Sequence, residues 1–558
     1  MADTSLFENV PVKVQKKSGF DKSHMNLLTT KVGTLTPILV DEVIPNETVN
    51  LKVNLSASLP PLASDTFMRV DLKTEAFFVP MRLLYGGFQN WYTRSKVTSN
   101  TSTGTTDSVV AMPLIEVPGS KCQPGSLADY LGIKAHSALT SNTYINPMPF
   151  VAYHKIYDEW YRNSLVQAPV FKSWNATTTN VTPGTLKQVS WLPFITYTEA
   201  MAANLNNVLA NTGSAATFAD GVSIWDLRQR NFGNDYFTTA TPNPQNGEAQ
   251  SVGMTVPLTG DTSGKTSFTI GALRAANSIQ QYLERLNLAG NRYVDQLRAV
   301  YNAHLSDGVA QRPILLGSAS FNVYSKGIYQ TANGALSGSG ISSNNPLGTT
   351  VGAQFGSAYA SGSDFIIKGF TANEPGYIFV IASLVPKVTY GSGTRRYIRH
   401  FLGDMGNTQP NGTNGHGDLA NPMLQNVGPQ PIYTFELGTA LAGNSIFGYQ
   451  DRYAEYKTMN DELHGLLRDG QSLQAFALQR TFSSANTVIG NDFLQIPTTY
   501  LDQVAAVEGD ISKYGVWIDS YMDYKVTMPL ARYSIPTLQD PAYEHGDDIT
   551  ISRAGTHL

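Results

Sequence analysis

The chain has 558 residues, which is long enough for several domains, although large β proteins often form a single domain of this length. Only 15% of the residues are charged, whereas Gly (48), Pro (29) and Tyr (28) are abundant, and this combination is typical of a surface that other subunits cover. A formal net charge of −4 excludes a chain that binds nucleic acid over its whole surface. An unusually turn-rich monomer is the alternative explanation of the composition.

Neither an export signal nor a membrane-spanning segment is expected. Residues 1–31 lack the apolar stretch of a signal peptide, and the longest apolar run, residues 377–385, is about half the length that crosses a bilayer as a helix. The single cysteine, Cys122, excludes an internal disulfide framework and is typical of assembly in a reducing cytoplasm. We expect residues 1–31 to form a mildly basic N-terminal arm.

The strand that ends at Pro80 is the clearest element in the sequence. Side chains alternate from Val70 to Phe78, and Pro80 ends the strand because proline lacks the N–H group that a ladder needs. Phe77 and Phe78 therefore point to opposite faces, which predicts a central strand covered by protein on both sides. Further strands are expected at residues 49–55, 377–388, 432–437, 473–482 and 516–528.

Two helical regions and three long loops interrupt these strands. Aromatic residues recur at helical steps from Phe150 to Leu165, and apolar residues at 273–286 and 293–300 predict two helices on either side of Gly290. Long, weakly charged loops are expected at residues 93–143, 168–223 and 327–363. Strands scattered between such loops favour an all-β sandwich with insertions over a parallel α/β sheet.

No catalytic or metal-binding pattern is found in the sequence. Residues 260–266 (Gly-Asp-Thr-Ser-Gly-Lys-Thr) have three residues between the glycines, whereas a phosphate-binding loop needs four. The histidines show no HExxH motif and no spacing with cysteine that would assemble metal ligands. We therefore expect no enzyme, no catalytic residue, no metal and no cofactor; a glycosidase-like enzyme with an unrecognised acidic pair is the alternative.

Two basic groups are candidates for contact with single-stranded DNA. Arg395, Arg396 and Arg399 lie close to two tyrosines in the sequence, and the predicted arm contains Lys13, Lys16 and Lys17. Basic side chains neutralise phosphates and aromatic rings stack on exposed bases, so either group could face DNA. An ion-paired cluster at a subunit interface is the alternative for the arginines.

Several short blocks, in a fixed order along the chain, share a resemblance to one family. The blocks are Gly33-Thr34-Leu35-x-Pro37, Asp41-Glu42-Val43-x-Pro45, Phe77-Phe78-Val79-Pro80-x-Arg82-Leu83, Ala152-Tyr153-x-Lys155-Ile156-Tyr157, Asn234-Asp235-Tyr236-Phe237-Thr238-Thr239-Ala240, Gly290-x-Arg292-Tyr293 with Gln311-Arg312-Pro313, and Phe447-Gly448-Tyr449-Gln450-x-Arg452-Tyr453-Ala454-Glu455-Tyr456. Together they resemble the major capsid proteins of the microviruses (Microviridae, gokushovirus-like), which are tailless icosahedral bacteriophages with single-stranded DNA.

The resemblance implies a viral jelly roll, an eight-stranded antiparallel β-sandwich that would occupy residues 32–558 as one domain. It also implies self-assembly into an icosahedral (T=1) shell of about 60 copies around the genome, within the virion and after assembly in the bacterial cytoplasm. The implied partners are single-stranded DNA, a small basic DNA-binding protein, a pilot protein, a scaffolding protein and a host-cell surface receptor. A β-rich receptor- or carbohydrate-binding virion protein is the alternative function.

The resemblance further implies that residues of the blocks take part in subunit contacts. The candidates are Phe77, Phe78, Pro80, Arg82, Tyr153, Tyr157, Tyr236, Phe237, Arg292, Tyr293, Tyr449, Gln450, Arg452, Glu455 and Tyr456. The loops at 93–143 and 168–223 are expected to include the surface that meets the host, because exposed loops commonly carry recognition.

Overall fold

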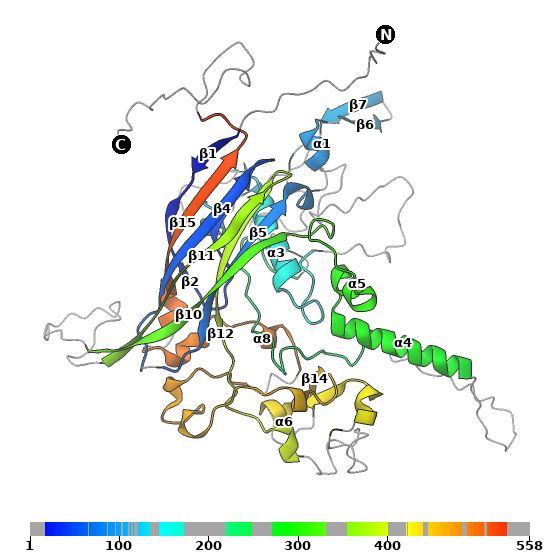
Figure 1. Cartoon of the computed structure of the whole chain (residues 1–558), viewed down its shortest axis with the longest axis vertical. Helices are drawn as coiled ribbons and strands as arrows, with labels where there is room; N and C mark the ends of the chain where they lie inside the picture. The colour runs from blue at the N-terminus through cyan, green and yellow to red at the C-terminus, as the bar shows by residue number, and fades with distance from the viewer. Residues whose placement is uncertain are drawn as a thin grey trace, which may run out of the picture.

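One curled antiparallel sheet forms the centre of the molecule in the computed structural model (Figure 1). The structure describes residues 17–171, 218–247, 270–330, 354–399, 420–482 and 488–532, apart from short gaps inside these ranges. Its strands are β1 (Ser18–Asp21), β2 (His24–Thr30), β3 (Thr36–Val43), β4 (Thr48–Ser58), β5 (Val70–Pro80), β10 (Ile314–Gln330), β11 (Gln354–Thr371), β12 (Gly376–Pro386) and β15 (Val516–Met528). Neighbours follow the order β1-β15-β4-β11-β10-β5-β12-β3, and β2 also pairs with β15.

The sheet folds into two leaves that enclose a single apolar core. One leaf contains β3, β12, β5 and the first half of β10, and the other contains β11, β4, β15 and β2. Buried and exposed residues alternate along β4 and β15, and the buried set joins the core between the leaves. The predicted antiparallel jelly-roll sandwich is therefore confirmed.

Glycine is required at two positions where β10 and β11 approach each other closely. A Cβ atom on Gly317 would lie 2.1 Å from the carbonyl oxygen of Ile366, and one on Gly362 would lie 1.9 Å from the ring of Phe321. No side chain fits at such distances, so Gly317 lets the backbone of β11 approach β10, and Gly362 leaves room for the ring of Phe321.

Side chains from β2, from β15 and from the turn before β2 connect their leaf to β3. Asn26 Nδ2 donates to Ile38 O (2.9 Å), and the Lys22 ammonium and the Tyr524 hydroxyl both donate to Asp41 Oδ2 (2.7 Å each). Residues 18–30 thus belong to the sheet, although the sequence placed them in an arm without strands. The periodicity of β1 and β2 is weak because both strands are largely exposed, so only pairing with β15 reveals them.

Strands β5 and β12 are buried on both faces, as the sequence predicted for the strand that ends at Pro80. Phe78 joins the core between the leaves, whereas Phe77 joins a second apolar cluster on the outer face of the same leaf. That outer cluster includes helix α3 (Met148–Ile156) and Trp225, so inserted segments supply the second covering layer.

The remaining elements are short, except for one long helix. Three small sheets consist of β6 (Lys96–Thr101) with β7 (Gly104–Val109), β8 (Ile115–Glu116) with β9 (Tyr144–Ile145), and β13 (Gln430–Tyr433) with β14 (Ile446–Gln450). The other α-helices are α1 (Phe88–Tyr92), α2 (Leu127–Tyr130), α4 (Ile270–Ala289), α5 (Tyr293–Tyr301), α6 (Thr434–Leu437), α7 (Ala454–Lys457), α8 (Asn491–Leu494) and α9 (Asp510–Tyr514). The two helices expected around Gly290 are confirmed.

Three local predictions are wrong. The strand expected at 432–437 turns into helix α6 after Tyr433, where Glu436 accepts a hydrogen bond from Tyr433 N. The prediction failed because a short apolar run does not distinguish a strand from a helix. Residues 473–482 form a 3-10 turn and isolated bridges instead of a strand. The loop expected at 327–363 is strand at 327–330 and 354–363, while residues 331–353 lie outside the described part.

The structure describes only parts of the other two predicted loops and of the predicted arm. The segment 93–143 contains the β6–β7 hairpin, strand β8 and α2. Residues 172–217 of the loop expected at 168–223 lie outside the described residues, as do residues 1–16 of the predicted arm.

Replacing Phe78 with Ala is expected to lower the free energy of unfolding by about 3–5 kcal/mol, because its ring fills the core beside Phe370 at a centroid distance of 5.1 Å. Chemical denaturation of the unassembled subunit measures this change. Phe67→Ala is the matched control, because that side chain is 78% exposed and its loss should cost less than about 0.5 kcal/mol. Equal effects of the two substitutions would contradict the assigned core.

Candidate functional site

The sequence blocks converge at two places in the folded chain, and the first is helix α3 with the π-helical turn that follows it (Tyr157–Tyr161). Tyr153 is buried on α3, donates its hydroxyl hydrogen to Leu35 O (2.7 Å) and accepts one from Arg228 N (2.8 Å). Burial raises the pKa of Tyr153 well above its usual range, so the group stays neutral. These two bonds fix α3 to the segment that leads into β3 and to the segment that contains Arg228.

Arg292, between α4 and α5, binds the end of the same turn. Its Nη2 atom donates to Asp158 O (2.7 Å) and to Arg162 O (2.6 Å), which satisfies carbonyl groups that a helix end leaves without a partner. Burial and the nearby Arg162 charge lower the pKa of the Arg292 guanidinium. The block around Arg292 therefore anchors the base of α4 and α5 to α3.

Arg312 completes this first convergence. Its guanidinium lies over the ring of Trp160 at 4.6 Å, and Trp160 Nε1 donates to Pro313 O (2.9 Å). Such stacking gives a cation and an indole a favourable contact. Three blocks far apart in sequence thus meet around one helical turn.

The second convergence joins the block at 234–240 to the block at 447–456. Gln450 Nε2 donates to Tyr236 O (3.0 Å) and to Thr239 Oγ1 (2.8 Å), and Thr241 and Tyr449 form a two-way backbone bridge. Tyr236 and Phe237 are buried in the apolar cluster between these segments. The two blocks therefore hold one another in place below the sandwich (Figure 1).

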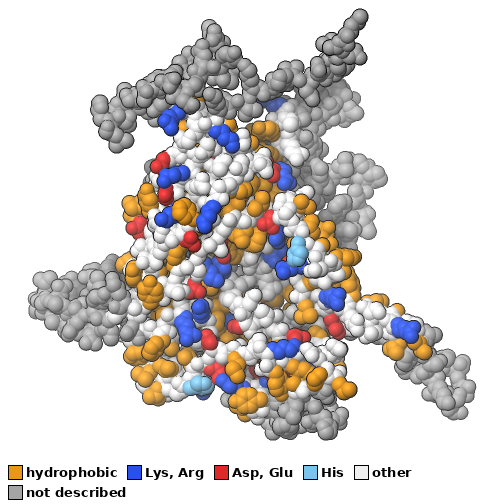
Figure 2. Space-filling view, in the orientation of Figure 1, with side chains coloured by type: hydrophobic (Ala, Val, Ile, Leu, Met, Phe, Trp, Pro, Cys, Tyr) orange, Lys and Arg blue, Asp and Glu red, His pale blue; other side chains and the backbone are white. Residues whose placement is uncertain are grey.

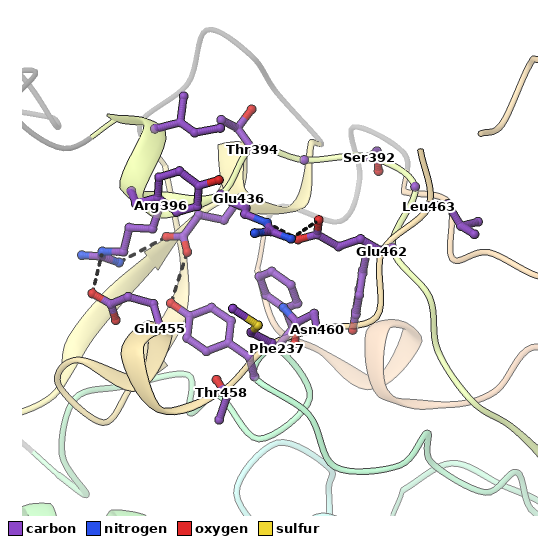
Figure 3. Close-up of a pocket in the computed structure, with 18 of the residues that line it drawn as sticks. Phe237, Ser392, Thr394, Arg396, Glu436, Glu455, Thr458, Asn460, Glu462 and Leu463 are labelled. Atoms are coloured by element: carbon purple, nitrogen blue, oxygen red, sulfur yellow. Dashed lines mark hydrogen bonds and ion pairs between the residues drawn. The ribbon is translucent and has the colours of Figure 1, made fainter. Parts of the chain in front are cut away.

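A buried ion cluster lies beside these blocks. We name it the Arg396 cluster and define it as Arg396, Glu436, Glu455 and Tyr236. Figure 3 labels Arg396, Glu436 and Glu455. Arg396 Nη1 donates to Pro431 O (2.7 Å) and Glu436 Oε1 (3.2 Å), while its Nε atom lies 3.6 Å from Glu455 Oε1. Tyr236 donates to Glu436 Oε2 (3.1 Å). A cavity of about 600 Å³ opens next to the cluster.

Burial controls the electrostatics of the Arg396 cluster. Desolvation raises the pKa of Glu436, and the attraction of Arg396 opposes that rise. Burial and the adjacent Glu436 charge raise the pKa of Tyr236 far above its usual range. The guanidinium of Arg396 is directed at carboxylates inside the subunit, so the arrangement is structural.

The six candidates for DNA contact differ in their surroundings in the structure. Arg395 forms two hydrogen bonds to Glu462, from Nε and from Nη2 (2.7 Å each), and this pairing lowers the pKa of Glu462. Arg395 and Arg396 are thus ion-paired with carboxylates of their own subunit, whereas the subunit interface of the alternative stays a prediction. The side chain of Arg399 and residues Lys13 and Lys16 lie outside the described part, and Lys17 is exposed.

Most block residues expected at subunit contacts are buried within the subunit. Phe77, Phe78, Pro80, Tyr153, Tyr157, Tyr236, Phe237 and Arg452 are buried, whereas Arg82, Arg292, Tyr449, Gln450 and Glu455 are half-buried and Tyr293 and Tyr456 are exposed. A side chain enclosed by its own subunit has no surface left for a neighbour. The direct-contact hypothesis therefore has to be restricted to the exposed and half-buried members.

Residues that the sequence did not single out complete the site. Glu436 and Glu462 neutralise Arg396 and Arg395 from 40 and 67 residues away, a separation that no motif or spacing indicates. Among the described residues, no group of three or more His, Cys, Asp or Glu side chains is arranged to bind a metal ion. No helix in this part of the chain is long and apolar enough to span a membrane.

Comparisons with known proteins agree on one family. The family model described as "Capsid protein (F protein)" matches residues 8–538. Capsid protein VP1 of Chlamydia phage 1 is 25% identical over 96% of this chain and 97% of its own length. Capsid protein VP1 of Bdellovibrio phage phiMH2K is 26% identical (95% and 97%), and that of Spiroplasma virus 4 is 23% identical (92% and 94%).

Glu436→Gln is expected to change how stability depends on pH. Because burial raises the folded-state pKa of Glu436 above its unperturbed value of 4.5, the folded subunit binds this proton more tightly than the unfolded chain. The stability from this proton is complete below pH 4.5 and is lost as pH rises through the folded-state pKa. Melting temperatures measured from pH 4 to pH 7 should therefore fall less in Glu436→Gln than in the wild type.

Glu462→Gln is the matched control, with the opposite sign. The pKa of Glu462 is lowered by Arg395, so its contribution is present above the unperturbed pKa and is lost on acidification. Glu462→Gln should be less stable than the wild type near neutral pH, with the difference vanishing at low pH. Parallel pH profiles for Glu436→Gln and the wild type would refute the assigned burial of the Glu436 charge.

Proposed function

The chain belongs to the phage capsid family described as capsid protein (F protein), and on this premise we propose that it assembles into an icosahedral (T=1) shell of about 60 copies around a single-stranded DNA genome. It has a structural role as the major capsid protein of a phage and is located in the virion. The match to residues 8–538, almost the whole chain, is the observation that carries this proposal. The two phage relatives, both named capsid protein VP1, support it.

The surface of the subunit is suited to extensive contacts between copies. Large apolar or aromatic side chains are exposed on several elements, among them Tyr293 (68%), Tyr301 (75%) and Trp517 (52%). Over the whole chain, only 15% of the residues are charged. Aromatic residues with depleted charge are typical of the buried centre of an interface.

The charge of the chain supports the proposal that another protein neutralises most of the packaged genome. A subunit with a net charge of −4 cannot neutralise a genome, and the charges of Arg395 and Arg396 are already paired with carboxylates. A small basic protein of the same virus would therefore neutralise most phosphates, and the subunit would touch DNA mainly through Lys13, Lys16 and Lys17. Scaffolding and pilot proteins, assembly in the host cytoplasm and a host receptor that meets the loops at 93–143 and 168–223 belong to the same proposal.

The proposal is tested by expressing the full chain, alone and with the other virion proteins, and imaging the products by electron microscopy. Closed isometric particles whose mass corresponds to about 60 copies are the expected result. Particles with a different copy number would contradict the T=1 arrangement. A chain that stays monomeric in both experiments would contradict the shell itself.

Purified unassembled subunits are expected to bind single-stranded DNA weakly and with a shallow dependence on salt. The logarithm of the binding constant falls by about 0.7 per neutralised phosphate for each logarithmic unit of salt, and few lysines are available. Fluorescence anisotropy from 50 to 300 mM salt measures the slope. Replacing Lys13, Lys16 and Lys17 with Gln should flatten it further, whereas Arg395→Gln should leave it unchanged; the reverse pattern would assign the contact to the arginine group.

A further inference from the structure

Helices α4 and α5 bury few residues in the isolated subunit, and most residues of the N-terminal half of α4 are exposed. Only Leu286 and Asn287 are buried on α4, and no residue is buried on α5. The N-terminal half of α4 extends away from the sandwich, and hydrophobic side chains lie on the projecting part (Figures 1 and 2). Its anchor lies at the other end, where Asn287 Nδ2 donates to Asn243 O (2.7 Å) and Arg292 holds the turn after α3.

The exposed face of α4 carries the spacing of a coiled-coil seam. Ala272, Ala275, Ile279, Tyr282 and Leu286 follow one another at alternating steps of three and four residues, which places them on one stripe of the helix. Ile279 is 45% exposed and Tyr282 is 50% exposed, and both alanines are also exposed. The body of the subunit covers only Leu286, at the C-terminal end of the stripe.

The stripe is complementary to itself when two copies run antiparallel. A two-fold axis that faces the stripe at the level of position 277 along the helix brings Ala272 opposite Tyr282 of the second copy and Ala275 opposite Ile279 of the second copy. Each layer then combines a small residue with a large one, which is the arrangement that packs facing helices without voids. Parallel pairing would instead face alanine with alanine and tyrosine with tyrosine.

The charged residues nearest to the stripe on α4 do not lie on the face that carries it. Between Ile270 and Leu283, Arg274 is the only charged residue, and successive turns of 100° per residue place it and Glu284 on the side of the helix away from the stripe. A two-fold contact needs such a self-complementary patch, because each copy presents the same surface. We propose that the stripe formed by Ala272, Ala275, Ile279 and Tyr282 pairs antiparallel with the same stripe of a second copy across a two-fold axis.

This inference deepens the proposed function, because it assigns one of the contacts that a closed shell requires. Cysteine cross-linking tests it directly. Subunits with Ala275→Cys are co-expressed with subunits with Ile279→Cys, oxidised and separated on a denaturing gel. A covalent dimer is expected in the mixture and not in either variant alone, since only the antiparallel layer brings positions 275 and 279 together. The native Cys122 is buried and serves as the unreacted background.

A dimer formed by Ala275→Cys alone would overturn the antiparallel arrangement in favour of a parallel one. The absence of a dimer from oxidised particles that contain both variants would overturn the pairing altogether, whatever else covers α4. Failure of the wild-type chain to form any particle would count against the proposed shell instead. The two hypotheses therefore fail in distinguishable ways.

A charge placed on the stripe provides the second measurement. Ile279→Asp should lower the yield of particles at least tenfold while the melting temperature of the unassembled subunit changes little, because Ile279 is exposed there. Asn277→Asp is the matched control, because it adds the same charge on the opposite side of α4 and should assemble normally. Equal particle yields from the two variants would refute the proposal.

Discussion

Strands β5 and β12 have to be covered on both faces, and the rest of the structure depends on that constraint. A leaf with one apolar face is covered fully by its partner leaf. In this leaf, however, Phe77, Phe379 and Ile381 form a second apolar surface on the face away from the core, which needs its own cover. The described parts of the segments before and after α3 supply the missing layer, and they must be attached firmly to the leaf that they cover. Tyr153 and Arg292 attach them through hydrogen bonds to backbone carbonyl groups.

Buried ion pairs complement this apolar layering. Arg230 donates to both carboxylate oxygens of Glu75 (2.7 and 2.9 Å) and to Ser383 Oγ (2.9 Å), which joins β5, β12 and the segment at 229–232. Desolvation of two charges offsets most of their attraction, so such a network contributes little net stability. We infer that it specifies where the inserted segment lies. The Arg396 cluster has the same role for the segments below the sandwich.

A subunit built in this way suits a capsid. Several arginines of the described residues, among them Arg230, Arg395 and Arg396, are paired with carboxylates of their own subunit. We infer that contacts with other copies involve mainly exposed aromatic and aliphatic residues, as proposed for the stripe on α4. A surface with few charges also reduces repulsion between identical neighbours at short distance.

The sequence by itself determined the elements whose signal is local. Alternation in β4, β5 and β15, the stop at Pro80 and the apolar steps around Gly290 all depend on residues a few positions apart, and the blocks indicated the family. Only the tertiary structure decided which block residues are buried, that β1 and β2 join the sheet, and that Glu462 and Glu436 neutralise Arg395 and Arg396. Those outcomes depend on contacts between residues tens or hundreds of positions apart, and a linear pattern carries no information on which distant groups the closed chain brings together.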